Sequence, residues 1–231
     1  MNKKNRTRSK KNKIIIILLT LLLISSVLLN VFLFKNNKKN IIKKDVIIKD
    51  ENIVFFGDSI THQYTLEKFY PKNIVINSGI DGNVTKDLIG RIENDVYRYN
   101  PSKVFLLIGI NDKCREVSDK DILKNIQKII NGIKINRRYS DIYVESIYPL
   151  NHKEFENNNY NYCKNVDNDK IIELNKKIKD VCNESNVTYI DVYNKLTDKD
   201  GELKSIYTVE GLHLNDLGYL KVTTILNDYI K

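Results

Sequence analysis

The chain is organised around the stretch Phe55-Phe56-Gly57-Asp58-Ser59-Ile60-Thr61. The apolar run from Ile53 to Phe56 predicts a buried strand, and Gly57 and Asp58 end it because both residue types favour turns. Ser59 therefore stands at a strand-to-helix corner, where backbone N–H groups lack helical partners and the helix dipole favours negative charge. A serine at such a corner either caps the helix or, with a base in reach, attacks an acyl carbon while those N–H groups receive the oxyanion.

The positive charge of the chain lies in its N-terminal part. The 231 residues carry a formal net charge of +9, yet residues 1–44 hold twelve Lys and Arg and no acidic residue. The remainder carries 26 of the 38 basic side chains against all 29 acidic ones. A nucleic-acid-binding domain needs a basic face on its folded part, so no nucleic-acid partner is expected.

Residues 14–34 predict a transmembrane anchor. These 21 residues carry no formal charge and are mostly Ile, Leu, Val and Phe. At about 1.5 Å per residue, a helix of this length spans roughly 30 Å, the thickness of the hydrocarbon core of a bilayer. The alternative is a cleaved signal peptide, whose apolar region is shorter, about 7–15 residues, and ends at a small-residue site such as Ala-x-Ala. No such site follows this run.

The charges that flank this segment predict its orientation. Residues 1–13 carry seven Lys and Arg, and such residues favour the cytoplasmic side of a membrane. The lysine-rich residues 35–51 weaken this asymmetry and are expected to form a juxtamembrane linker. We therefore expect a single-pass protein of the cell membrane, with a basic cytoplasmic tail over residues 1–13 and one folded domain, residues 52–231, outside the cytoplasm.

The three cysteines give no strong signal. Cys114, Cys163 and Cys182 form neither a CxxC pair nor the spacing of metal ligands, so no metal site is predicted. We interpret them as small core or surface residues. A disulfide between Cys163 and Cys182 is the alternative outside the cell.

Apolar runs alternate with helical patterns from residue 52 onward. Five short runs predict strands: Ile53–Phe56, Ile74–Ile76, Val104–Ile108, Ile142–Glu145 and Thr188–Val192. Three stripes between them have the spacing of one helical face: Leu88, Ile92, Val96 and Tyr99; Ile122, Ile126, Ile129 and Ile133; Ile171, Leu174, Ile178 and Val181. Strands separated by helices predict an α/β fold, with a parallel sheet covered by helices on both faces.

Two helix starts and one irregular stretch complete this outline. Ser118 and Asp121 have the spacing of a capping box, and Asn215 can cap a last helix that runs to the C-terminus. Residues 151–168 are rich in Asn and Tyr, and we expect an exposed loop near the functional edge of the sheet. In parallel sheets that edge lies at the carboxyl ends of the strands.

Two segments that follow predicted strands can bind an oxyanion at this edge. The segment Asn77-Ser78-Gly79-Ile80-Asp81-Gly82-Asn83 has two glycines that suit a tight loop with a bare backbone N–H. In Gly109-Ile110-Asn111-Asp112, the amide of Asn111 can donate a hydrogen bond without carrying a charge. An ordinary glycine turn and an Asx turn are the alternatives.

A third segment, Glu210-Gly211-Leu212-His213-Leu214-Asn215, supplies a base. Histidine is the natural base for a serine, and a carboxylate three positions earlier can orient its ring. The other histidines are His62, one turn from Ser59 and a candidate pocket residue, and His152, to which we assign no role.

Together these segments resemble the four sequence blocks of the SGNH (GDSL-type) hydrolases. The blocks are Gly57-Asp58-Ser59-Ile60, Gly82 after Asn77-x-Gly79, Gly109-x-Asn111-Asp112 and Glu210-x-x-His213. They occur in the order of the family and span nearly all of residues 52–231. The resemblance implies a flavodoxin-like, three-layer α/β/α domain with a parallel five-stranded sheet, and ester hydrolysis through an acyl-enzyme without a metal or organic cofactor.

The resemblance also implies roles for single residues. It implies Ser59 as nucleophile, His213 as base, and an oxyanion hole made of the Ser59 and Gly82 N–H groups with the Asn111 amide. The chain departs from the family at Glu210, because the family acid is usually an Asp. Glutamate is one methylene longer, so its carboxylate must bend back or approach His213 from another angle; some relatives use a backbone carbonyl instead.

We interpret the chain as a membrane-anchored serine esterase that acts on carboxylic esters, with short acyl or O-acetyl esters of cell-surface polysaccharide as the first substrate expected. Lysophospholipids are the next choice. An O-acetyltransferase would use the same nucleophile with a sugar hydroxyl as acceptor, and a binding module without catalysis is a third class. The sequence predicts no oligomeric state.

Overall fold

The computed structural model of the chain describes residues 25–33 and 52–230. The chain divides into two units, Met1–Ile48 and Lys49–Lys231. In the first unit, residues 25–33 are helical with exposed side chains. Within the described residues, no helix has the length and apolar character needed to cross a membrane. The predicted tail (1–13), the linker (35–51) and most of the predicted anchor (14–34) lie outside the described residues.

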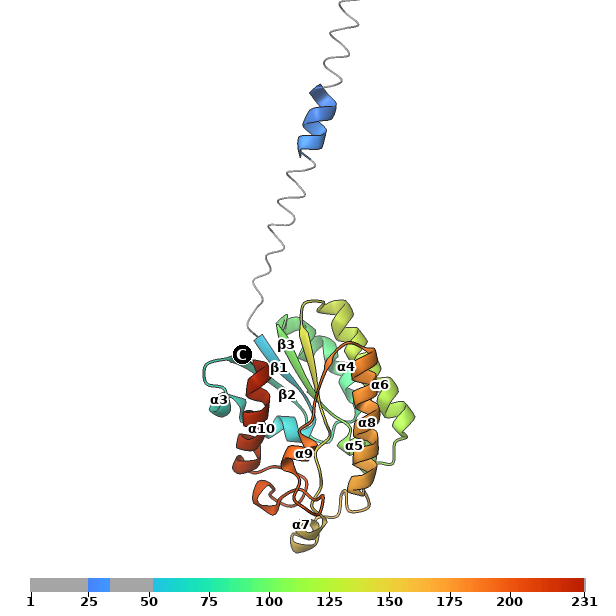
Figure 1. Cartoon of the computed structure of the whole chain (residues 1–231), viewed down its shortest axis with the longest axis vertical. Coiled ribbons are helices and arrows are strands. Elements are labelled where there is room, and N and C mark those ends of the chain that lie inside the picture. Colours follow the sequence, from blue (N-terminus) through green and yellow to red (C-terminus); the bar gives the residue numbers. More distant parts are fainter. Residues whose placement is uncertain (1–24, 34–51, 231) are drawn as a thin grey trace, which may run out of the picture. The chain divides into compact units, whose positions relative to one another are not determined.

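The second unit is built on a parallel sheet of five strands, which confirms the α/β prediction (Figure 1). The strands are β1 Asn52–Gly57, β2 Ile74–Gly79, β3 Lys103–Leu107, β4 Asp141–Glu145 and β5 Thr188–Ile190. Their order is β2-β1-β3-β4-β5 and every pair is parallel. This is the flavodoxin-like order. Every predicted strand is observed.

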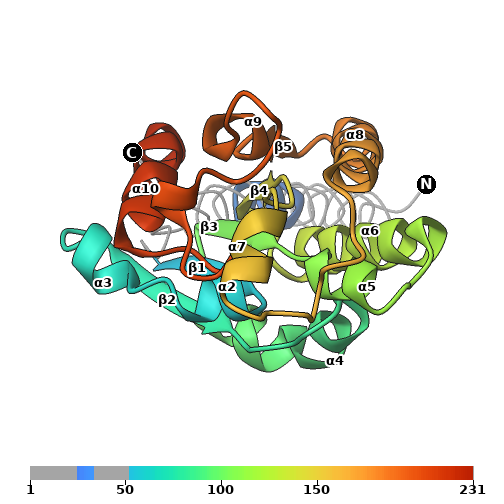
Figure 2. The same cartoon turned by 90° about the horizontal axis from the view of Figure 1, so that it is seen from below.

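Helices cover both faces of the sheet and form a three-layer α/β/α domain (Figure 2). One face carries α4 (Thr85–Asp95), α6 (Asp119–Asn136) and α8 (Asn168–Glu184). Their positions follow from right-handed crossovers, in which α4 crosses β1 to join β2 to β3, while α6 and α8 join neighbouring strands. The other face carries α10 (Asp216–Ile230) and the short α3 (Leu66–Phe69). The stripe of α6 is buried, since Ile122, Ile126, Ile129 and Ile133 are at most 1% exposed. In the other two stripes Ile92, Tyr99 and Val181 are only partly buried, and Tyr99 lies beyond the end of α4.

An aromatic stack spans the face of the sheet toward α10. Phe55, Phe105 and Tyr143 are in register on β1, β3 and β4, and each pair of neighbouring ring centroids is 4.8 Å apart. Stacked rings bury large apolar areas. Because Phe55 lies just before the Gly57-Asp58-Ser59 corner, this packing fixes the end of β1 from which the corner starts.

The segment 151–168 is more ordered than the predicted exposed loop. It begins with the helix α7, His152–Asn157, and buries Phe155, Cys163 and Val166. The side chain of Asn151 accepts a hydrogen bond from the Glu154 N–H at 2.9 Å and thereby caps α7. Asn and Tyr residues suggested a solvated loop, but caps and a few buried apolar residues are enough to fold it.

The expectations for the cysteines are corrected by a disulfide between Cys114 and Cys163. Cys114 ends the short helix α5, Ile110–Cys114, and Cys163 lies in the segment that follows α7. Cys182 is a free, buried thiol on α8, so the alternative pairing of Cys163 with Cys182 is wrong. The physical reason is proximity, because the Cα atoms of Cys114, at the end of α5, and Cys163 lie 4.9 Å apart, whereas Cys182 is buried on α8.

Candidate active site

Ser59 stands where β1 turns into the short helix α2, Ser59–His62. The Asp58 side chain caps this helix by accepting a hydrogen bond from the Ile60 N–H at 3.0 Å. The turn needs glycine at position 57, because a Cβ there would lie 2.2 Å from Thr61 Oγ1 and 2.4 Å from the Leu107 carbonyl oxygen. The local sequence therefore positions the Ser59 hydroxyl at the carboxyl edge of the sheet.

His213 reaches Ser59 from the far end of the chain. Its Nε2 atom lies 3.0 Å from Ser59 Oγ, and its Nδ1 atom is hydrogen-bonded to Glu210 Oε1. The side chains of His213 and Glu210 are 18% and 12% exposed, so bulk water barely competes with these contacts. The structure thus brings together the three side chains that the sequence predicted as a catalytic triad.

The extra methylene of Glu210 is accommodated by a carboxylate that bends back on its own loop. The same oxygen that meets the His213 ring also accepts the His213 backbone N–H at 3.3 Å. Thr208 closes the loop, because its Oγ1 donates to the His213 carbonyl at 2.8 Å and accepts from the Gly211 N–H at 2.7 Å. This turn holds glutamate in the place where the family usually has aspartate.

Gly82 and Asn111 lie at the same edge, beside Ser59. Gly82 has φ +71°, a conformation that side chains disfavour. Asn111, on α5, is 2% exposed, and its Nδ2 donates to the Asn83 carbonyl at 3.0 Å. An amide nitrogen carries two hydrogens, so one remains for another acceptor. Within residues 25–33 and 52–230, the backbone N–H groups of Ser59 and Gly82 have no acceptor.

These groups share one open pocket of about 330 Å³. Its lining comes from every predicted block and from the segment after α7: Ser59, Gln63, Asp81, Gly82, Asn111, Arg115, Tyr160, Tyr162, Leu212 and His213. A nucleophile, a base and three donors around one cavity are the parts needed for acyl transfer. The pocket has room for an ester group with a small acyl chain.

Comparison with known families agrees with this arrangement. The model of the GDSL-like Lipase/Acylhydrolase family matches residues 55–221, a range that holds all the predicted site residues. The chain belongs to this family. Membership confirms the resemblance noted from the sequence blocks.

Three proteins similar to this chain carry different names. A structure from Streptococcus pneumonia, named for platelet activating factor, is 30% identical, with a TM-score of 0.73, and the match covers 90% of this chain and 99% of that one. An N-acylneuraminate cytidylyltransferase from Streptococcus agalactiae is 26% identical over 73% of this chain. The chain spans 37% of the length of that relative. An arylesterase from Vibrio mimicus is 27% identical over 43% of this chain and 64% of its own.

Arg91 stabilises the backbone segments that carry this site, and the sequence analysis did not identify it. Its guanidinium donates to the Gly57 carbonyl at 2.7 Å, to the Ser78 carbonyl at 2.9 Å and to Asn83 Oδ1 at 2.7 Å, and it pairs with Asp95 at 2.7 Å. It thereby ties the ends of β1 and β2 to the loop that contains Gly82. The sequence did contain a hint of this role, because Arg91 lies in α4 next to the apolar stripe that faces the sheet.

Two buried carboxyls lie beside the reacting groups. Burial raises the pKa of Asp58 to about 7, against the lowering effects of the Ile60 N–H and of nearby His213, and its Oδ2 has no hydrogen-bond partner among the described residues. Burial also raises the pKa of Asp112, although its carboxylate accepts from Thr85 N and Oγ1. The Thr85–Asp112 contacts fasten α5, and hence Asn111, to the start of α4.

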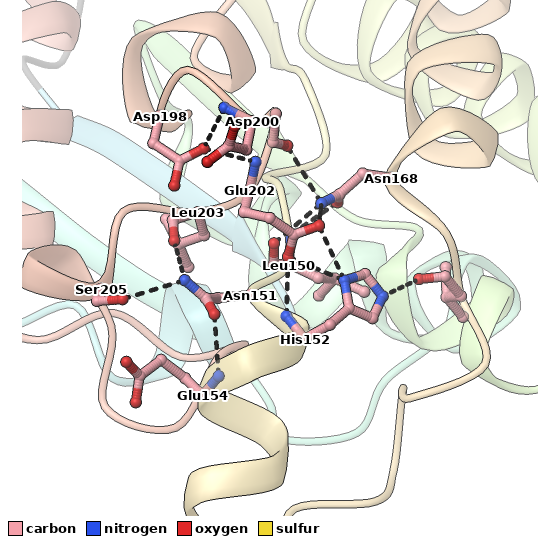
Figure 3. A network of polar contacts seen from close by, with 12 residues as sticks. Leu150, Asn151, His152, Glu154, Asn168, Asp198, Asp200, Glu202, Leu203 and Ser205 are labelled. Carbon is pink, nitrogen blue, oxygen red and sulfur yellow. Dashed lines mark hydrogen bonds and ion pairs between the residues drawn. The ribbon is translucent and has the colours of Figure 1, made fainter.

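A polar network anchors the segment that carries Tyr160 and Tyr162 (Figure 3). His152 Nδ1 lies 2.9 Å from Glu202 Oε2, and His152 Nε2 lies 3.0 Å from the Val166 carbonyl. Burial opposes a charge on His152, but these contacts outweigh it and raise its pKa. The ring of Tyr160 then meets the His213 ring edge-on, with centroids 6.3 Å apart. His152, which had no predicted role, therefore supports the wall of the pocket.

His62 does not line the pocket. Its Nδ1 atom lies 2.8 Å from Asp81 Oδ1, and both side chains are more than half exposed. Asp81 is the member of this pair that contributes to the lining. The expectation that His62 is a pocket residue is therefore replaced by an indirect contact through Asp81.

Proposed function

We propose that this chain hydrolyses short acyl esters, first of all O-acetyl esters of cell-surface polysaccharide, through an acyl-enzyme on Ser59. The observation that carries the proposal is the continuous row from Glu210 through the His213 ring to the Ser59 hydroxyl. Such a row is the arrangement that activates a serine nucleophile.

In the first half-reaction, Ser59 Oγ attacks the ester carbonyl carbon as His213 Nε2 takes its proton. The carbonyl oxygen becomes an oxyanion, which accepts from the N–H groups of Ser59 and Gly82 and from the free hydrogen of the Asn111 amide. The intermediate collapses, the C–O bond to the alcohol breaks, and His213 returns the proton to the leaving oxygen. Glu210 stabilises the transient imidazolium and holds its tautomer.

In the second half-reaction, water takes the place of the alcohol. His213 accepts a proton from the water as its oxygen attacks the acyl carbon on Ser59, and the same donors receive the second oxyanion. Collapse releases the carboxylic acid and returns the proton to Ser59 Oγ. Proton and bond changes balance over the cycle, and every step uses groups of this chain and the substrate.

The preference for a sugar ester rests on two supports. The chain is similar to an N-acylneuraminate cytidylyltransferase, a protein named for a sugar, and the open pocket of about 330 Å³ suits a small acyl group on a large alcohol. We use this relative only as support for a sugar substrate. We do not propose cytidylyl transfer, because the similarity spans 37% of that relative.

We also propose that the enzyme is tethered to the cell membrane with its catalytic domain outside the cytoplasm. The uncharged residues 14–34 support a tether. The Cys114–Cys163 disulfide supports the location, because disulfides persist in oxidising compartments. Protease treatment of intact cells tests this proposal: the domain should be degraded while a cytoplasmic marker survives, and protection of both would contradict it.

The decisive experiment compares full-length wild type with Ser59→Ala on p-nitrophenyl acetate and on a purified O-acetylated cell-wall polysaccharide, with free acetate as the readout. Wild type should release acetate without any added acceptor, and Ser59→Ala should not. Ser102→Ala, at the opposite edge of the sheet, is the matched control and should behave as wild type. Equal activity of the Ser59 variant would reject the assignment of the nucleophile.

A further inference from the structure

Arg115 is a charged side chain of the active-site pocket that the reaction cycle does not use. It follows α5, four positions after Asn111, and lines the same cavity as Ser59. Its Nη2 atom donates to the Gly82 carbonyl at 2.8 Å, and its Nε atom donates to the Tyr162 hydroxyl at 3.1 Å. Both acceptors are neutral. Its Nη1 group donates to no residue within 25–33 and 52–230.

The positive charge of Arg115 is also uncompensated. Over the described parts of the chain, no carboxylate forms an ion pair with it, whereas Arg91 pairs with Asp95 at 2.7 Å. Asp81, which lines the pocket, contacts His62 Nδ1 at 2.8 Å and not Arg115, and Glu210 contacts His213 Nδ1. A substrate that enters the pocket can therefore accept hydrogen bonds from the Nη1 group of the Arg115 guanidinium.

A disulfide holds this guanidinium in position. Cys114 and Cys163 are the chain neighbours of Arg115 and Tyr162, so the covalent bond and the Arg115–Tyr162 hydrogen bond form adjacent rungs between α5 and the segment after α7. The Cα atoms of the two cysteines are 4.9 Å apart. An exposed arginine normally loses side-chain entropy when it binds a ligand; here much of that ordering is already present.

We propose that Arg115, supported by Tyr162, binds an anionic group of the ester substrate, and that the enzyme prefers esters of acidic sugars or other alcohols that carry a carboxylate. The inference rests on the proposed function and adds the charge of the substrate. A guanidinium suits this task because its planar donors match the two oxygens of a carboxylate. Arg115 is a binding residue in this scheme and takes no part in proton transfer.

A matched pair of substrates isolates the charge. We compare kcat/KM for 4-acetoxybenzoate with kcat/KM for its neutral methyl ester, because both release the same acyl group. Wild type should prefer the anion, and Arg115→Gln should lower the anion-to-neutral ratio by about 10-fold, the low end for a charge-assisted contact because Arg115 is exposed. The loss of preference should appear mainly in KM. Added salt should shrink the wild-type preference.

Three further variants make the result specific. Arg115→Lys should give an intermediate ratio, since a lysine keeps the charge without the planar donors. Tyr162→Phe should lower the ratio less than Arg115→Gln, because the guanidinium stays. Arg138→Gln removes an arginine that lies over the Tyr139 ring, outside the pocket, and should leave the ratio unchanged. The ratio is the informative quantity, because Arg115 also holds the Gly82 loop and its loss lowers turnover of both esters.

A binding measurement separates this proposal from the proposed function. NMR titration of 4-acetoxybenzoate into Ser59→Ala measures affinity without turnover, and adding Arg115→Gln should weaken that affinity about 10-fold. If wild type hydrolyses neither ester but this difference in affinity remains, the reaction assignment fails and the anion site stands. If Arg115→Gln changes neither the kinetic ratio nor the affinity, the anion site is rejected.

Discussion

The His213 Nε2 atom and the Ser59 Oγ atom lie 3.0 Å apart, although 154 positions separate the two residues in the chain. Ser59 comes from the turn after β1, which lies between β2 and β3 in the sheet, and His213 comes from the loop that leads into α10. Both loops rise from the carboxyl edge, where a parallel sheet gathers the ends of its strands. Proton transfer between the two groups therefore requires no rearrangement of the backbone.

His213→Ala should lower kcat/KM for p-nitrophenyl acetate by at least about a thousand-fold, because no other base within residues 25–33 and 52–230 is hydrogen-bonded to Ser59 Oγ and loss of a triad member has effects of this order. His62→Ala, at an exposed position, is the matched control and should stay within a few-fold of wild type. Retention of more than a tenth of the wild-type rate by the His213 variant would contradict its role as base.

Glu210→Gln should lower kcat less than His213→Ala does, because loss of the acid costs less than loss of the base in a triad. The amide still fits the turn but no longer stabilises the imidazolium that forms during attack. The neighbouring acid Asp216 is held by Lys68 at 2.7 Å, so Asp216→Asn should leave the rate close to that of wild type. If the two variants exchange these outcomes in a steady-state assay, Asp216 is the functional acid.

Asn111→Ala should lower kcat by about a hundred- to a thousand-fold, the usual loss for one oxyanion donor. KM should change little, because the amide acts on charge that develops during attack. Asn131→Ala, on the outer part of α6, is the comparison variant. A fall in substrate affinity with unchanged kcat would show that Asn111 binds the ground state instead.

Glu145 makes the stability of the domain depend on pH. It is buried, accepts a hydrogen bond from Tyr148, and has a pKa raised by burial from 4.5 to about 7. The folded state thus holds its proton more tightly than the unfolded state. The resulting contribution to the free energy of unfolding is complete below pH 4.5 and is lost as the pH rises through 7, a change of about 3 kcal/mol.

Glu145→Gln should remove this dependence, since the amide resembles the protonated acid and does not titrate. Urea unfolding should show the variant gaining on wild type between pH 5 and pH 8. Asp58 titrates over the same range in both proteins and cancels in the comparison. Glu93→Gln, on the exposed side of α4, serves as control. Parallel pH curves for wild type and Glu145→Gln would reject the raised pKa.

The Cys114–Cys163 disulfide closes a loop between residues 49 positions apart. Replacing both cysteines by serine should lower the free energy of unfolding by about 2–4 kcal/mol, because the unfolded chain regains the freedom that the bond removes. Reduction of wild type should have a similar effect, whereas reduction of the double variant should change nothing. An unchanged melting temperature after verified reduction would argue against the bond as a stabilising link.

Short stretches of sequence predicted much of the fold and of the candidate site. Apolar runs predicted all five strands and apolar stripes predicted α4, α6 and α8, because strand and helix depend on residues two to four positions apart. The blocks at Ser59, Asn111 and His213 predicted the edge of the sheet where the site lies. Each block follows or precedes an element whose end is set by nearby turn and cap residues. The membrane anchor over residues 14–34 stays a prediction.

Tertiary structure alone decided which distant partners meet. The sequence favoured unpaired cysteines, offered Cys163 with Cys182 as the alternative, and left Arg91, Arg115 and Tyr162 without roles. In the folded chain Cys163 forms a disulfide with Cys114, and Arg91 and Arg115 donate hydrogen bonds to the loop that contains Gly82. The physical reason is that side-chain pairing across the functional edge depends on crossover geometry and burial, which join residues tens of positions apart and leave no local pattern.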